Sequence, residues 1–123
     1  GALSIRENGI MDMDVQKTDE LFETQWNLTK AQRLDYGQSL MTHAMVFTGV
    51  NLDGEGKPER WRVENSWGKE AGKDGYYVMG DRWFDEYTYQ VVVNRKYLTE
   101  EELRQYESEP IALEPWDPMG SLA

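Results

Sequence analysis

The sequence predicts an α+β domain in which short antiparallel strands form a partly closed, barrel-like sheet with short helices at its periphery. Several β-rich segments follow one another through brief polar or glycine-rich loops, as in an antiparallel sheet. No stretch alternates strand and helix, so a parallel α/β sheet is not expected. With 123 residues, of which 39% are hydrophobic, the chain is large enough for one domain with a modest core.

The first part of the chain is expected to be irregular and then to form one short helix. Residues 1–28 carry scattered acids and isolated apolar side chains. Thr29 and Gln32 have the spacing of a capping box, in which two side chains satisfy free N–H groups at a helix start. This signature predicts a helix over residues 30–36 that stops at Gly37.

Two strands are predicted in the middle of the chain. Residues 41–52 are β-rich and nearly uncharged, which is typical of a strand buried on both faces. Residues 59–65 alternate instead, with Trp61, Val63 and Asn65 on one side and charged side chains on the other. The polar run DGEGKP between the two strands is expected to be a loop.

The next segments continue the α+β pattern. A second glycine-rich loop at 68–75 leads to a predicted strand at Tyr76–Met79. Residues 81–86 are typical of one or two helical turns, and the run YTYQVVVN at 87–94 predicts a further strand.

The C-terminal part is predicted to form a helix and an extended tail. A second capping box begins at Thr99, so a helix is expected from there to about Glu107. The last fourteen residues, PIALEPWDPMGSLA, contain three prolines and are expected to be extended, with Trp116 and Met119 as their apolar anchors.

Charge and composition exclude several classes of function. The net charge is −10 and there is no basic run, which argues against nucleic acid and anionic membranes as partners. The sequence contains no cysteine and one histidine, so neither a disulfide framework nor a zinc site is expected. No apolar stretch approaches the length of a membrane span and none resembles a signal peptide, so a cytoplasmic location is expected.

One loop resembles a calcium site only in part. In NLDGEGKPERWR, Asn51, Asp53, Glu55 and Gly56 occupy suitable positions. The twelfth position, where a bidentate Glu is required, is Arg62. A hairpin loop is therefore the expected structure.

His43 and Asn65 are the candidate chemical pair. Each alone has an ordinary interpretation, His43 as a satisfied core residue and Asn65 as a turn residue. Together they fit a general base whose second ring nitrogen is held by an amide oxygen, an arrangement that suits a thiolate nucleophile. Trp67 follows Asn65 by two positions, where its indole could shield that hydrogen bond from water.

Three segments carry a family resemblance. THAMVFTGV, WRVENSWGKEAGKDGYYVM and PWDPMGSLA together resemble the C-terminal part of papain-like cysteine peptidases. More narrowly, SLMTHAM and WDPMG are similar to the bleomycin hydrolase / aminopeptidase C family. The resemblance runs from about Gly9 to Ala123.

The resemblance implies a role for each candidate residue. His43 matches the catalytic base, Asn65 the residue that orients it, and Trp67 the indole packed over their contact. Ala123 matches the end of a tail that lies in the enzyme's own cleft, where its carboxylate receives the amino terminus of the substrate. No metal or organic cofactor is implied.

The resemblance also implies how this chain relates to a whole enzyme. Residues 1–109 are expected to be the lobe that bears the histidine and asparagine, and residues 110–123 the tail. Because the sequence has no cysteine, the nucleophile and the first lobe are expected upstream of residue 1. The chain alone is expected to be inactive. The parent is expected to be a cysteine aminopeptidase with a Cys-His-Asn triad that removes N-terminal residues from peptide substrates and assembles as a homohexamer.

Two alternatives belong to other classes. The first is a non-catalytic interaction module that has kept the papain-like lobe. The second is a serine hydrolase that uses Ser39 or Ser66 with His43, although the sequence lacks the glycine pattern of a nucleophile elbow.

Overall fold

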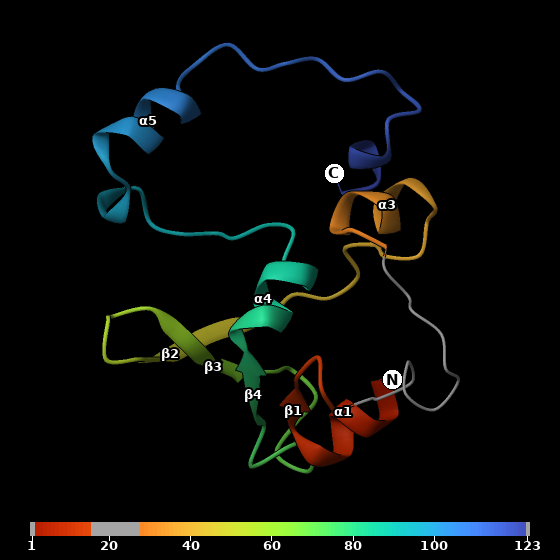
Figure 1. Ribbon diagram of the computed structural model, residues 1–123, viewed down its shortest axis with the longest axis vertical. Coiled ribbons are helices and arrows are strands. Elements are labelled where there is room, and N and C mark those ends of the chain that lie inside the picture. Colours follow the sequence, from red (N-terminus) through yellow and green to blue (C-terminus); the bar gives the residue numbers. More distant parts are fainter. Residues whose placement is uncertain (1, 16–27, 123) are drawn as a thin grey trace.

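A four-stranded sheet organises the fold (Figure 1). The computed structural model describes residues 2–15 and 28–122. The strand order is β1-β4-β3-β2, with bounds Ile10–Met11 for β1, Val46–Leu52 for β2, Pro58–Glu64 for β3 and Tyr76–Gly80 for β4. The β2–β3 and β3–β4 pairs are antiparallel, whereas β1 pairs with β4 in parallel.

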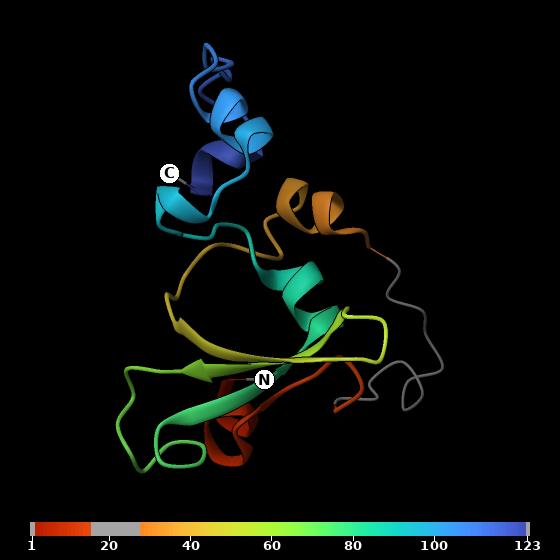
Figure 2. The same cartoon turned by 90° about the vertical axis from the view of Figure 1, so that its left-hand side faces the viewer.

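Some short helices lie beside the sheet, and others lie away from it on one side (Figures 1 and 2). Among the described residues, four are α-helices: α1 (Ala2–Asn8), α3 (Lys30–Asp35), α4 (Asp81–Tyr87) and α5 (Glu100–Tyr106). Two are 3-10 helices: η1 (Arg95–Tyr97) and η2 (Pro118–Leu122). The α+β class is therefore confirmed, but among the described residues the sheet stays open and does not close into a barrel.

Both capping-box predictions are confirmed. At the start of α3, the Thr29 hydroxyl accepts a hydrogen bond from the Gln32 N–H, and the Gln32 side-chain oxygen accepts one from the Thr29 N–H. Thr99 and Glu102 do the same at α5. The two Glu102 hydrogen bonds with the Thr99 N–H and hydroxyl lower the pKa of that carboxyl. The predicted helical turns after the Tyr76 strand are found as α4.

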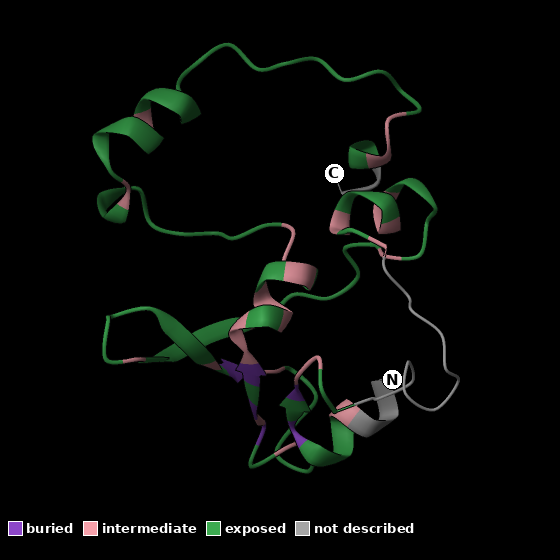
Figure 3. Ribbon diagram, in the orientation of Figure 1, coloured by how far each residue is buried: buried purple, intermediate pink, exposed green. Residues whose placement is uncertain are grey.

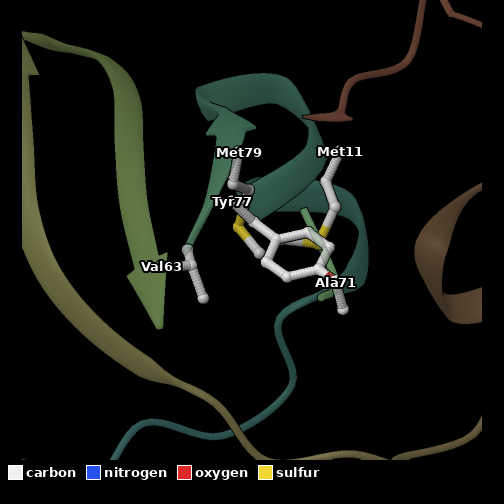
Figure 4. Packing of buried hydrophobic residues seen from close by; sticks show 5 residues of the cluster. All are labelled: Met11, Val63, Ala71, Tyr77 and Met79. Atoms are coloured by element: carbon white, nitrogen blue, oxygen red, sulfur yellow. The ribbon is translucent and has the colours of Figure 1, made fainter. Parts of the chain in front are cut away.

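The core is small and lies on one face of the sheet (Figures 3 and 4). Its buried members come from β1, β3, β4 and the loop before β4: Met11, Val63, Ala71, Tyr77 and Met79. Ile5 from α1 and the aromatic rings of Trp83 and Phe84 from α4 pack against this cluster. The alternation predicted for β3 is confirmed at Val63, which is completely buried.

The prediction that residues 1–28 are irregular is wrong for their described part. Residues 2–11 contain α1 and β1, which the rest of the fold holds in place. The carbonyl of Gly9 accepts the Val78 N–H at 2.8 Å, and the carbonyl of Arg6 accepts the Gly72 N–H at 2.8 Å. These bonds join residues distant in sequence, so no local pattern indicates them.

The prediction of a strand buried on both faces at 41–52 is also wrong. The strand begins only at Val46, and every residue of β2 is exposed. β2 is the edge strand of the sheet, with β3 as its single neighbour among the described strands. Burial depends on what packs on the faces of a strand, and apolar composition alone does not provide that cover.

The strand predicted at 87–94 is not formed. α4 continues to Tyr87, and residues 88–94 belong to no helix or strand. Val92 is 96% exposed. A strand needs a partner to bond its N–H and C=O groups, and within the described part of the chain none lies beside this segment.

The extended tail is found only in part. Residues 109–114 are irregular, but η2 follows and lies against α3 (Figure 1). Trp116 is 79% exposed and Met119 is 50% exposed, so the prediction that they anchor the tail is wrong for this structure. Residues 88–117 lead away from the sheet before the chain meets α3 at η2, so little surface is near enough to cover them (Figures 1 and 2).

Gly72 is required by the loop that precedes β4. Its φ is +60°, and an added Cβ would lie 2.5 Å from the Tyr76 carbonyl oxygen and 3.0 Å from the Tyr77 ring. We expect Gly72→Ala to lower the free energy of unfolding by about 2–4 kcal/mol, through left-handed strain and overpacking. Urea denaturation measures this change.

Gly54→Ala is the matched control, because an added Cβ there meets nothing within 4 Å. We expect it to change the stability by less than about 0.5 kcal/mol. Equal urea unfolding midpoints for Gly72→Ala and Gly54→Ala would contradict the prediction and show that the loop before β4 relaxes around the extra methyl group.

Candidate active site

His43 and Asn65 meet across the end of the sheet. His43 lies between α3 and β2, and Asn65 directly follows β3. The His43 Nε2 lies 2.8 Å from the Asn65 Oδ1, across a separation of 22 residues. The predicted contact between these two side chains is therefore present.

The local hydrogen bonds determine which ring nitrogen carries the proton. Asn65 Oδ1 also accepts the Ser66 N–H at 2.8 Å. A backbone N–H can only donate, so the Asn65 atom that it meets must be the amide oxygen. His43 Nε2 must then be the donor to that oxygen. In the neutral ring, Nδ1 keeps its lone pair and is the nitrogen able to accept a proton.

The backbone holds Asn65 through the sheet and the glycine-rich loop. The Asn65 N–H donates to the Gly75 carbonyl at 3.0 Å, and the Gly75 N–H donates to the Ala71 carbonyl at 3.0 Å. Gly68 and Gly75 have φ values of +89° and +86°, which suit glycine. The loop therefore connects the end of β3 to the start of β4 while aiming the amide toward His43.

Trp67 lies beside the imidazole. The two ring centroids are 5.1 Å apart, and the planes are inclined by 31°. Tyr77, which is buried, meets Trp67 edge to face with centroids 6.1 Å apart. Trp67 therefore packs beside His43, but it shields the hydrogen bond from water incompletely, because His43 is exposed and Trp67 is 39% exposed.

Tyr77 supports the site, and no motif in the sequence indicates this role. Its ring connects the core to Trp67 and so limits where the indole can lie. The available signal was its place in β4, where it shares a face with Met79. Which loop residue lies over that face is a tertiary property.

The serine alternative receives no support from the contacts. The Ser39 hydroxyl accepts a hydrogen bond from the Tyr89 hydroxyl at 2.5 Å. Within the described part of the chain, neither Ser39 nor Ser66 has a side-chain hydrogen bond to His43. The sequence has no cysteine, so a thiol nucleophile is not supplied by this chain.

Other expectations concern ligands and the tail. Among residues 2–15 and 28–122, no three His, Cys, Asp or Glu side chains gather as a metal site. No helix in the same ranges has the length and apolar character to cross a membrane. The prediction for Ala123 lies outside the described residues.

Known proteins are similar to this chain in sequence and in fold. The profile of the peptidase C1-like family matches residues 1–120. Aminopeptidase C of Streptococcus thermophilus is 54% identical over the whole chain, and bleomycin hydrolase of Rattus norvegicus is 52% identical over 94% of it. The crystal structure of PepW from Lactobacillus rhamnosis HN001 superposes on 96% of the chain, with a TM-score of 0.83 and 53% identity.

The chain corresponds to only part of the length of these proteins. The chain spans 28% of the aminopeptidase C from Streptococcus thermophilus, 26% of the rat bleomycin hydrolase and 27% of the PepW chain. The family profile and the relatives nevertheless cover nearly all of the chain itself. The chain therefore belongs to the peptidase C1-like family.

Proposed function

We propose that this chain provides the general base and its orienting amide to a cysteine aminopeptidase. The observation that carries the proposal is the contact between His43 Nε2 and Asn65 Oδ1, which leaves Nδ1 as the basic nitrogen. The relatives named aminopeptidase C and bleomycin hydrolase support the reaction class. The thiol itself would come from residues outside this sequence, which has no cysteine.

The proposed reaction proceeds in two halves. His43 Nδ1 takes the thiol proton, and the thiolate attacks the first peptide carbonyl of the substrate. Collapse of the tetrahedral adduct breaks the C–N bond, the imidazolium protonates the leaving amine, and a thioester remains. Water, deprotonated by His43, then hydrolyses the thioester and releases the N-terminal amino acid and the free thiol.

Asn65 and Trp67 support these transfers without exchanging protons. The amide oxygen keeps the proton on Nε2, so the ring presents Nδ1 in both halves of the reaction. Trp67 lies against the ring and restricts its rotation. All proton transfers are between the thiol, the imidazole, water and the leaving amine, so this scheme needs no metal or organic cofactor.

The wider setting is part of the same proposal. The substrates are peptides with a free amino terminus, and the enzyme is cytoplasmic. The homohexamer implied by the family resemblance stays a prediction for the whole protein. The net charge of −10 argues against binding of nucleic acid by this part of the enzyme.

The proposal is tested on the longer polypeptide that carries this sequence. We expect it to release the amino acid from an aminoacyl-coumarin substrate and to lose that activity after alkylation with iodoacetamide, since the nucleophile is a thiol. Activity that withstands complete alkylation would overturn the cysteine mechanism.

The isolated chain is expected to show no turnover of the same substrate. A base and an orienting amide without a nucleophile supply only weak polarisation of the carbonyl. The assay compares the chain with its His43→Ala variant. Turnover that disappears in that variant would contradict the prediction and restore the serine alternative.

A further inference from the structure

Two cations of α3 hold the C-terminal end of α4. The Lys30 ammonium donates to the carbonyl oxygens of Asp85 at 2.7 Å and Thr88 at 2.6 Å. The Arg33 guanidinium donates to the Glu86 carbonyl at 3.0 Å and forms an ion pair with the Glu86 carboxylate. The last carbonyls of a helix lack intrahelical partners and carry partial negative charge, so cations bind there favourably.

Arg33 is built into this junction. Its side chain is only 11% exposed, and it also donates to the Leu28 carbonyl at 2.8 Å. Burial alone would lower the pKa of Arg33, but the hydrogen bond and the charge of Glu86 together raise it. The guanidinium is therefore held in its charged form between two segments of chain.

Aromatic rings complete the junction. The Lys30 ammonium lies 5.0 Å from the centre of the Tyr89 ring, and the Arg33 guanidinium lies 5.0 Å from the centre of the Tyr87 ring. Both are cation–π contacts, which are stronger when desolvated. We call Lys30, Arg33, Tyr89 and Ser39 the α3–α4 clamp.

The clamp continues into the segment that bears His43. After α3, the N–H groups of Gln38 and Ser39 both donate to the Arg33 carbonyl, at 2.8 and 3.1 Å. The Ser39 hydroxyl accepts the Tyr89 hydroxyl at 2.5 Å. Ser39 is thus attached to both sides of the junction.

His43 lies between this attachment and the sheet. Residues 40–45 form no helix or strand, and β2 begins at Val46, which pairs with Glu64. Glu64 directly precedes Asn65. The sheet therefore anchors the downstream end of the His43 segment next to Asn65, and the clamp anchors its upstream end.

We propose that the α3–α4 clamp positions His43 and that Tyr89 and Ser39 are positioning residues of the catalytic site. This inference rests on the proposed function only for its effect on rate. A segment with one loose end presents the imidazole over a range of positions, and a misplacement of about 1 Å can lower a rate by about 10²-fold. The His43–Asn65 contact then depends on the hydrogen bond between Tyr89 and Ser39, which joins two segments 50 residues apart in the sequence.

The first test uses the chain as it stands and needs no activity. His43 is its single histidine, so its imidazole gives one pair of nitrogen signals in an ¹⁵N NMR spectrum. We expect Tyr89→Phe, which keeps the ring over Lys30, to shift these signals toward those of Asn65→Ala. Ser39→Ala removes the other partner of the Tyr89–Ser39 hydrogen bond. The double variant should shift the His43 signals no further, because both changes break the same hydrogen bond.

Tyr87→Phe is the matched control. It removes a hydroxyl two residues away that has no hydrogen bond among the described residues, and it keeps the ring beside Arg33. We expect its His43 signals to equal those of the parent chain. If Tyr89→Phe and Ser39→Ala both leave the His43 signals unchanged, the clamp is only a joint between helices and the inference is wrong.

The second test measures rate in the longer polypeptide. We expect Tyr89→Phe to lower kcat about tenfold with KM unchanged, because a misplaced base affects the transition state more than substrate binding. The unfolding midpoint should stay close to the parent value. If Tyr89→Phe shifts the His43 signals but the longer polypeptide is inactive, the clamp is supported and the proposed function is rejected. If the longer polypeptide is active and Tyr89→Phe leaves its kcat unchanged, the clamp is rejected.

Discussion

Replacement of His43 by alanine in the full-length peptidase should abolish acylation. The imidazole is the proposed acceptor of the thiol proton and the donor to the leaving amine, and general acid–base catalysis alone contributes about 10²–10⁴-fold. The thiol would also lose the cation that stabilises its ionised form. We therefore expect kcat/KM to fall at least about 10³-fold, measured with an aminoacyl-coumarin substrate.

Asn65→Ala separates orientation from proton transfer. Its side-chain oxygen accepts both the His43 Nε2–H and the Ser66 N–H, so the variant frees the ring and one backbone donor. We expect a smaller loss than for His43→Ala, since the base remains. Thr42→Ala, an exposed neighbour of His43, is the control and should keep full activity. Equal losses for the two site variants, both folded, would mean that Asn65 does more than orient.

Deletion of Gly120–Ala123 should change the type of peptidase. If the tail fills the cleft, it blocks the subsites beyond the first residue and offers a terminal carboxylate to the substrate's ammonium group. Such a pair at about 4 Å gains about 4 kcal/mol at an effective dielectric constant near 20, before desolvation reduces it. We expect the truncated full-length enzyme to cleave inside N-terminally blocked peptides, and we expect the parent to leave such peptides intact.

The described part of the tail ends beside α3. η2 lies against α3, and α3 leads through Ser39 to the His43 segment. Gly120→Ala is the matched control, because an added Cβ there meets nothing within 4 Å and the tail keeps its length. A truncated enzyme that still acts only on free amino termini, at an unchanged rate, would show that the tail has no such role.

The predictions that rest on local chemistry were confirmed. The capping boxes at Thr29 and Thr99 act within one helical turn, so local chemistry was enough to place α3 and α5. The alternation of 59–65 located β3 and its buried Val63. The pairing of His43 with Asn65 was also predictable, because its residue types suit only a few kinds of site.

Other features were decided by tertiary structure. The runs at 41–52 and 87–94 have strong β propensity, yet β2 is exposed and the second run forms no strand. α1 and β1 depend on backbone bonds from Arg6 and Gly9 to Gly72 and Val78. A strand propensity describes the backbone conformation that a segment favours. Strand pairing and burial also require a second surface, which the segment itself does not contain.

The candidate site also combines local and tertiary contributions. The sequence alone indicated which side chains are proposed to do the chemistry and, through the short spacing of Asn65 and Trp67, that amide and indole lie together. Only the tertiary structure brought His43 to them, oriented the Asn65 oxygen through the Ser66 N–H and joined Ser39 to Tyr89. Hydrogen bonds act within about 3 Å, so residues separated along the chain become partners only after the sheet and α4 have placed them.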